Sequence, residues 1–303
     1  MRNIAELRSV SIGPIAAEIL RHAHELDVIA VFERSFYLMA PDGIICVALD
    51  VLGPGPINVL ITPMSGAQPW TGGLPAETKA VTSAGRLTVG SAFTIDLATA
   101  RRWQPPPWPA VSKGALERGP PEVRRLALPL LPHDGLAPLV LSSSVAPIRS
   151  LTMEAATGIV TELQRSLPRD LSTGNWSANA LRSATLLVGL GPGLTPSGDD
   201  VLGGMMLALS ALGQSDLRDA LWQTIGAELD DLTVPISAMH LSAAADGFGT
   251  EAMHRMIGAV VAGNVAEIAA LLPGMSDIGA TSGWDALAGA VLTLDAWNGR
   301  PDA

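Results

Sequence analysis

Hydrophobic and polar positions follow different patterns in the two halves of the chain. In the first hundred residues, short runs rich in Val, Ile, Phe and Tyr are separated by Gly- and Pro-containing turns, as in "DVIAVFERSFYLM", "IICVALDVL" and "GRLTVGSAFTIDL". Such runs, punctuated by turn residues, are typical of β-strands. After about Ser150 the apolar positions recur at helical spacing, as in "LTMEAATGIVTELQRSL" and "TEAMHRMIGAVVAGN".

These patterns predict an α+β protein with two domains. Residues 1–148 form a β-rich domain, either an antiparallel sheet or a small barrel, and residues 149–303 form an α-helical domain. Nine of the 23 prolines lie between Pro105 and Pro138. Because proline removes a backbone donor and fixes φ, we expect an extended connecting arm at about 104–138 in the first domain.

Start and stop signals define the expected helices. The first helix of the second half should stop at Pro168, and later helices should be capped by Ser215 and Thr233. The last helix should begin near Ser282 and end before Gly299.

Composition narrows the class of protein. The chain is 48% hydrophobic and 16% charged, with a formal net charge of −10 and no dense Lys/Arg run, so nucleic acid and anionic membrane are not expected partners. The longest nearly uncharged apolar segment, Val201 to Gly213, is shorter than the roughly 20 residues that span a bilayer. The N-terminus carries Glu6 and Arg8 where a signal peptide needs an apolar core, so we expect a cytoplasmic protein. The single cysteine, Cys46, is expected to be a buried inert thiol.

The most unusual stretch is "GLGPGLTPSGDD", Gly189 to Asp200, which precedes an apolar helix. Ser197 fits an N-cap with Asp200 at the third helical position, a capping-box pattern. Phosphate-loop, dinucleotide and nucleophile-elbow motifs all fail here. Asp199 stands where a phosphate loop needs Lys, the glycines lack GxGxxG spacing, and the serine lacks GxSxG context.

The start of this helix is echoed near the C-terminus. "SGWDALAGAVLTL" from Ser282 matches "SGDDVLGGMMLAL" from Ser197 at seven of thirteen positions, including the Ser-Gly-x-Asp start. The echo suggests two similarly capped helices packed through small residues. Asp200 and Asp285 would occupy equivalent positions, either as helix caps or in one polar cleft. Asp199 has no evident capping duty, and this favours a functional role for it.

The candidate site is drawn from these two helix starts and from the segment around Pro235. The predicted catalytic residues are Asp199 and Asp200. The carboxylates would bind a divalent cation or orient an amide or ammonium group, and loop and helix donors would bind an anionic or carbonyl group. The predicted ligand-binding residues are Gly191, Gly193, Thr195, Ser197, Gly198, Thr233, Ser237, Ser282 and Asp285.

Three segments carry a family resemblance: "GLGPGLTPSGDD", "TVPISAMHLSAAADG" and "TSGWDALAG". They resemble a largely uncharacterised bacterial family that includes the third (AllH-type) subunit of the oxamate carbamoyltransferase complex of allantoin catabolism. The similarity covers most of the chain. Where the family often shows Gly-His-Ser-Ser-Gly, this chain has Gly-Ala-Thr-Ser-Gly at 279–283 and lacks the histidine.

The resemblance implies carbamoyl transfer or related purine-nitrogen metabolism, with a small polar or anionic substrate and other protein subunits as partners. On this hypothesis the chain is a subunit that supplies a Gly-rich ligand-binding loop. Two alternatives remain open at this stage. One is a free-standing hydrolase or lyase with Mg²⁺ held by Asp199, Asp200 and Asp285, and the other is a non-catalytic scaffold subunit in which these acids are caps.

Overall fold

Two units make up the chain, Met1–Pro105 and Pro106–Ala303, and each has its own hydrophobic core. The computed structural model describes residues 5–62, 70, 74–75, 77–142 and 150–300. The predicted domain boundary at 148–149 lies outside these described residues. The described residues from Pro106 onward all belong to the second unit.

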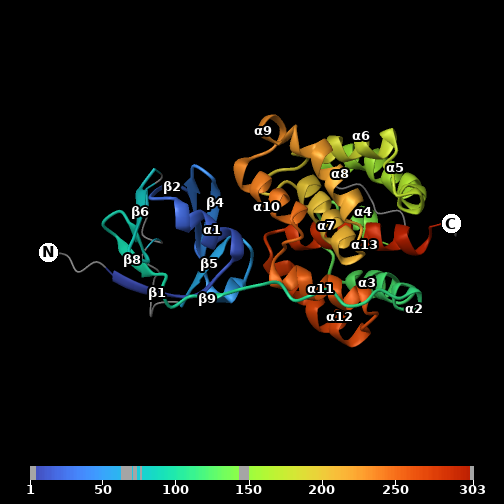
Figure 1. Cartoon of the computed structure of the whole chain (residues 1–303). Helices are drawn as coiled ribbons and strands as arrows, with labels where there is room; N and C mark the ends of the chain where they lie inside the picture. Colours follow the sequence, from blue (N-terminus) through green and yellow to red (C-terminus); the bar gives the residue numbers. More distant parts are fainter. Residues whose placement is uncertain (1–4, 63–69, 71–73, 76, 143–149, 301–303) are drawn as a thin grey trace. The chain divides into compact units, whose positions relative to one another are not determined.

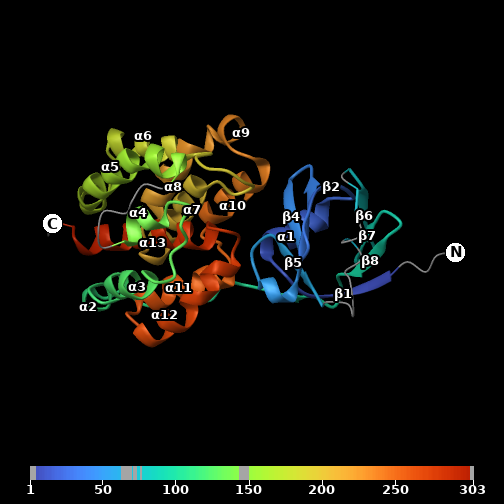
Figure 2. The ribbon, with the colours of Figure 1, turned by 180° about the vertical axis from the view of Figure 1, so that it is seen from behind.

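The first unit is a β-barrel, as Figures 1 and 2 show from opposite sides. Hydrogen bonds link the strands in the order β5-β4-β3-β2-β6-β7-β8-β1, and β1 also pairs with β5, which closes the barrel. Strand β9 (Arg101–Arg102) extends the sheet along β1. The barrel strands are β1 (Ala5–Ile12), β2 (Glu25–Val31), β3 (Ser35–Ala40), β4 (Gly43–Leu49), β5 (Asn58–Ile61), β6 (Lys79–Ser83), β7 (Arg86–Val89) and β8 (Phe93–Asp96).

Alternation along the strands fills the barrel with side chains. Leu87 and Val89 of β7 are fully buried, and so are the flanking aromatic residues Phe36 and Phe93. These two rings pack with Trp70 at centroid distances of 5.3–5.9 Å. The predicted β-rich unit is therefore confirmed as a barrel with a side-chain core. Its sheet is mixed rather than wholly antiparallel, because β1–β8 and β4–β5 pair in parallel.

Two further helical elements belong to the first unit. Helix α1 (Pro14–His22) contributes Ala16, Ala17 and Ile19 to the barrel core, and a short 3₁₀ turn, η1 (Asp50–Leu52), follows β4. The thiol of Cys46 on β4 is buried, and burial raises its pKa to about 12. The prediction of a buried, inert thiol is confirmed, because a thiol with this pKa holds its proton at neutral pH.

The second unit is helical. Helices α7 (Ser197–Ala211) and α13 (Ser282–Asn298) lie side by side at its centre, as both views show, and both are buried along most of their length. No helix in the described part of the chain combines the length and apolar character needed to cross a membrane. The other elements are α2 (Lys113–Leu116), α3 (Gly119–Ala127), α4 (Ala137–Leu141), α5 (Leu151–Thr173), α6 (Ala178–Leu187), α8 (Ser215–Gly226), α9 (Leu229–Leu232), α10 (Pro235–Ala245), α11 (Glu251–Val261), α12 (Val265–Leu271) and the 3₁₀ segment η2 (Leu272–Asp277).

The proline-rich segment does more than connect. It forms α2, α3 and α4, in which prolines stand in the first turns of α3 and α4. Proline fits there because the first-turn N–H groups have no partner within the helix. Val123, Ala127 and Leu136 are fully buried in the core of the helical unit.

Three of the predicted helix boundaries are wrong. Helix α5 continues through Pro168 to Thr173 and ends at Gly174, which adopts φ +67°. Leu163, Leu167 and Leu171 bury one face on both sides of the proline, and this packing outweighs the lost hydrogen bond. Thr233 does not cap α10, because the N-cap is Val234. Ser215 does not cap α8 either, because it is the first helical residue and the N-cap is Gln214. The last helix spans Ser282–Asn298, as predicted.

Candidate functional site

The Gly-rich loop runs from the end of α6 to the start of α7. Gly189, Gly191 and Gly193 all have positive φ, so the backbone turns where a side chain would be strained. The N–H of Gly198 donates to the carbonyl oxygen of Leu190 at 2.9 Å and closes the base of the loop. Gly193 lies exposed at the loop tip, with nothing within 4 Å of the position of a Cβ.

The predicted capping boxes are wrong. Ser197 and Ser282 are the first helical residues, and the N-caps are Pro196 and Thr281, neither of which makes a side-chain cap bond. The N–H groups of Asp199 and Asp200 both donate to the carbonyl oxygen of Pro196.

Both serines act on the opposite helix instead. The hydroxyl of Ser197 on α7 stabilises the charged form of Asp285 on α13. The hydroxyl of Ser282 on α13 stabilises the charged form of Asp200 on α7. The serine of each Ser-Gly-x-Asp motif therefore interacts with the aspartate of the other motif, on the opposite helix.

Glycines make this exchange geometrically feasible. A Cβ at Gly204 of α7 would overlap the carbonyl oxygen of Ala286 on α13, and a Cβ at Gly289 of α13 would overlap that of Val201 on α7. When the two similar segments that start at Ser197 and Ser282 are aligned, Gly204 corresponds to Gly289 and Val201 to Ala286. The two contacts are therefore equivalent. The predicted packing of the two helices through small residues is confirmed, with an approximate two-fold relation between them.

Asp285 is fully buried beneath the turn that leads into α4. Its Oδ1 accepts the N–H groups of Leu136 at 2.6 Å and Ala137 at 2.7 Å. Gly135 leaves the room for this carboxyl group, because a Cβ there would lie 2.7 Å from Oδ2. Burial raises the pKa of Asp285, although the hydroxyls of Ser197 and Thr281 and the two N–H donors oppose the rise. None of these donors completes a hydrogen bond with Oδ2.

Asp200 occupies the equivalent place on α7. The residue is partly exposed, but its Oδ2 is buried and has no hydrogen-bond partner. Burial raises the pKa of Asp200 well above its usual value, and repulsion from Asp285 raises it further. Two acidic groups that repel each other in a buried place do not both ionise easily.

Asp199 faces a different set of residues. Its Oδ1 accepts the N–H of Gly189 at 2.8 Å, and its Oδ2 accepts the hydroxyl groups of Thr233 and of Ser237. Asp199 thus holds the start of the loop and the start of α10 against α7. This is the structural role that the sequence pattern did not reveal.

The predicted site residues therefore fall into two groups. Asp200, Asp285, Ser197 and Ser282 come together at the two helix starts, and Thr195 joins them through a 2.8 Å hydroxyl contact with Ser282. The second group is Asp199 with Thr233 and Ser237. Gly191 and Gly198 have packing roles, because a Cβ would crowd the N atom of Ser197 in the first case and the carbonyl oxygen of Leu187 in the second.

Sequence reasoning missed the contribution of the turn before α4. Gly135, Leu136, Ala137 and Thr281 all contact or act on Asp285. The available signal was "HDGLAP", in which Asp-Gly marks a turn and Pro138 marks a helix start. Nothing local in those letters shows that the turn packs on a helix about 150 residues later.

The acids do not assemble a metal site. Among the described residues, no group of three or more His, Cys, Asp or Glu side chains could hold a metal ion. Asp199 turns to its own hydroxyl partners, so the predicted Mg²⁺ site of Asp199, Asp200 and Asp285 is not formed.

The two helical histidines lie outside this site. His254 is buried, accepts the N–H of Gly249 at Nε2 and stacks on Trp108 at 4.3 Å between ring centroids. Burial lowers its pKa to about 4 and that of His240 to about 4. Both rings are therefore neutral at pH 7.

Comparison with known families supports the resemblance over part of the chain. Residues 187–294 match the family model described as Oxamate carbamoyltransferase subunit AllH. This matched stretch, residues 187–294, is called the AllH-type segment below. The segment covers a little over one third of the chain, less than the motifs implied, and it runs from the last residue of α6 into α13. Comparison with curated proteins and with solved structures gave no match.

The AllH-type segment contains both Ser-Gly-x-Asp helix starts, and Asp199 as well.

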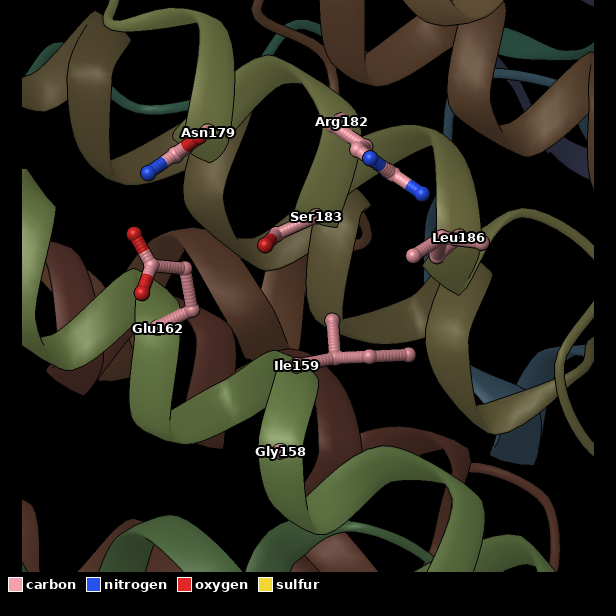
Figure 3. Close-up of a pocket in the computed structure, with 7 residues that line it drawn as sticks. All are labelled: Gly158, Ile159, Glu162, Asn179, Arg182, Ser183 and Leu186. Carbon is pink, nitrogen blue, oxygen red and sulfur yellow. The ribbon is translucent and has the colours of Figure 1, made fainter.

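A separate surface cavity of about 260 Å³ lies between α5 and α6, before the AllH-type segment in the chain. Figure 3 shows Glu162 of α5 and Arg182 of α6 at the rim of this cavity. Glu162 is already paired with Arg165, at 2.7 Å. The paired helix starts are the stronger candidate, because they combine buried acids with unpartnered atoms.

Proposed function

We propose that the chain is a subunit of an oxamate carbamoyltransferase-type complex and that its helical unit contributes a small-ligand site at the starts of α7 and α13. The observation that carries the proposal is the extent of the AllH-type segment, which begins just before the Gly-rich loop and includes both helix starts. The buried, unpartnered oxygens of Asp200 and Asp285 lie inside that segment. They supply polar groups whose hydrogen-bonding capacity is not used by the protein itself.

Protein partners follow from the same proposal. A subunit named for a complex acts with other chains, and the activity belongs to the assembly. The test is to purify the tagged chain together with the products of its neighbouring genes and to measure carbamoyl transfer from carbamoyl phosphate to oxamate. Co-elution with a partner and activity that requires this chain support the proposal. A chain that elutes alone, with full activity in the partners without it, refutes it.

A scaffold subunit is the second candidate, and Asp199 favours it. The three hydrogen bonds of Asp199 join the loop, α7 and α10, as a purely structural acid would. The two candidates differ in the assembled complex. Asp285→Asn keeps the shape and the Oδ1 acceptor, so a scaffold tolerates it, whereas a ligand site loses turnover or substrate affinity. The exposed Asp230→Asn serves as the matched control.

A further inference from the structure

We propose that Asp200 and Asp285 form a carboxyl pair that holds a single proton and recognises a primary amide group of the ligand. The inference rests on the proposed function, since it assigns the chemistry of the same site. It goes further by specifying which atoms bind, in which protonation state, and what kind of group they accept.

The first argument is the pair of unused oxygens. Oδ1 of Asp285 accepts hydrogen bonds from two backbone N–H groups, whereas its Oδ2 is buried without a hydrogen-bond partner. Oδ2 of Asp200 is also buried without a hydrogen-bond partner. A buried acceptor without a donor destabilises a folded protein by roughly 1–3 kcal/mol. The two atoms belong to equivalent residues of paired helices, which is unlike a random packing defect, and donors of a ligand would satisfy them.

The second argument is the charge around the pair. The charged groups that act on Asp200 are Asp285 and Asp199, and both are acidic. The groups that act on Asp285 are hydroxyls and N–H donors from α7, from the α4 turn and from Thr281. Arg124 of α3, which packs beside α13, is paired with Asp295, ten residues further along that helix. With no cation among these neighbours, one proton is the simplest way to relieve the repulsion.

A singly protonated pair matches a primary amide. It offers one O–H donor from the neutral carboxyl and acceptor oxygens from the carboxylate. A primary amide offers the converse, one carbonyl acceptor and two N–H donors. A carboxylate ligand lacks the N–H donors and meets the remaining negative charge. The pair therefore selects an amide over a carboxylate of the same shape, and no bond is made or broken in this step.

The loop provides the route to the pair. Asp200 is the partly exposed member, and the loop residues Pro192, Gly193 and Leu194 are exposed. The hydroxyl groups of Thr195 in the loop and Ser282 on α13 lie 2.8 Å apart. Ser282 also acts on Asp200, so the loop contacts a residue that interacts directly with the pair.

Oxamate and oxalate are suitable probes, because they differ only in an amide against a carboxylate. Calorimetric titration of the full-length chain and of the assembled complex should show at least tenfold tighter binding of oxamate than of oxalate. In Asp200→Asn and in Asp285→Asn this preference should fall to less than threefold, while Asp230→Asn keeps it. Oxamate affinity of the wild type should also decline as rising pH removes the last proton of the pair.

A second readout protects against variants that fold poorly. Infrared difference spectra of the wild type at neutral pH should contain the carbonyl band of a protonated carboxyl group, and the band should be absent from Asp200→Asn, because Asp200 is the member whose pKa is raised further. Wild-type protein that does not bind oxamate overturns the inference, and so do variants that keep the preference for oxamate. An active complex with such variants leaves the proposed function standing. Amide-selective binding by a chain that joins no complex refutes the proposed function alone.

Discussion

Replacement of Asp199 by alanine tests whether this acid stabilises the fold or acts on the ligand. The change removes an acceptor of three hydrogen bonds, one from the N–H of Gly189 and two from the hydroxyls of Thr233 and Ser237. Hydrogen bonds to charged groups contribute about 1.5–3 kcal/mol each, and the hydroxyls can turn to other acceptors. We therefore expect Asp199→Ala to lower the free energy of unfolding by about 3–5 kcal/mol.

Urea unfolding followed by tryptophan fluorescence is the assay. Five of the seven tryptophans, from Trp108 to Trp297, lie in the helical unit, so the signal reports mainly on that unit. Asp199→Asn keeps one acceptor oxygen and should lose about half as much stability. Exposed Asp230→Ala should change stability by no more than about 0.5 kcal/mol.

The result that would refute this reasoning is specific. If Asp199→Ala unfolds within about 1 kcal/mol of the wild type but abolishes activity of the complex, then Asp199 acts on the ligand and the structural account fails. Loss of stability with unchanged activity per folded molecule supports it.

Three further predictions concern the paired helices. Gly204→Ala should destabilise the helical unit by about 3 kcal/mol or more in urea unfolding, because its Cβ overlaps the backbone of α13, whereas neighbouring Gly203→Ala, which meets only a distant Ala244 methyl group, should be neutral or stabilising. The pKa of Asp285 is raised to about 6, so the native state keeps a proton that the unfolded chain releases, and this contribution to stability is lost as pH rises from about 4 to about 6. A shift of roughly two pKa units corresponds to about 3 kcal/mol, and the wild-type curve of stability against pH should therefore fall more steeply than that of Asp285→Asn; parallel curves would contradict the assignment. Gly135→Ala should displace the Asp285 carboxyl and strain a residue at φ +83°, which thermal unfolding would register as a lowered midpoint, and an unchanged midpoint would show that the turn yields freely.

Much of the fold could be read from local patterns. Strand-forming runs between turn residues predicted the β-rich unit, and helical spacing predicted the second unit and the bounds of its last helix. The sequence could not decide between an open sheet and a barrel, because closure depends on β1 pairing with β5 and β8, far along the chain. Helices in the proline-rich segment were missed because proline is a helix breaker except in the first turn, where α3 and α4 place it.

The sequence indicated the equivalence of the two helix starts but not the contacts that they make. The echo of Ser-Gly-x-Asp located Asp200 and Asp285 correctly as equivalent, because repeated letters report repeated geometry. Capping preferences then assigned each serine to its own helix, whereas the structure directs it to the other. Asp199 lacked a local role in the sequence because its partner hydroxyls lie 34 and 38 residues away. Tertiary contacts of this kind leave no periodic trace.

The glycine contacts between α7 and α13 also limit how this site can diverge. At Gly204 and Gly289 the two helices meet backbone to backbone, so no rotamer change can alter the spacing of the two helix starts. Larger side chains at Gly204 or Gly289 would increase the distance between the axes of α7 and α13 and separate Asp200 from Asp285. A chain of this kind can acquire a new ligand preference by rebuilding the loop at the rim. The distance between its two acids is fixed by the main chain and changes only if the whole crossing changes.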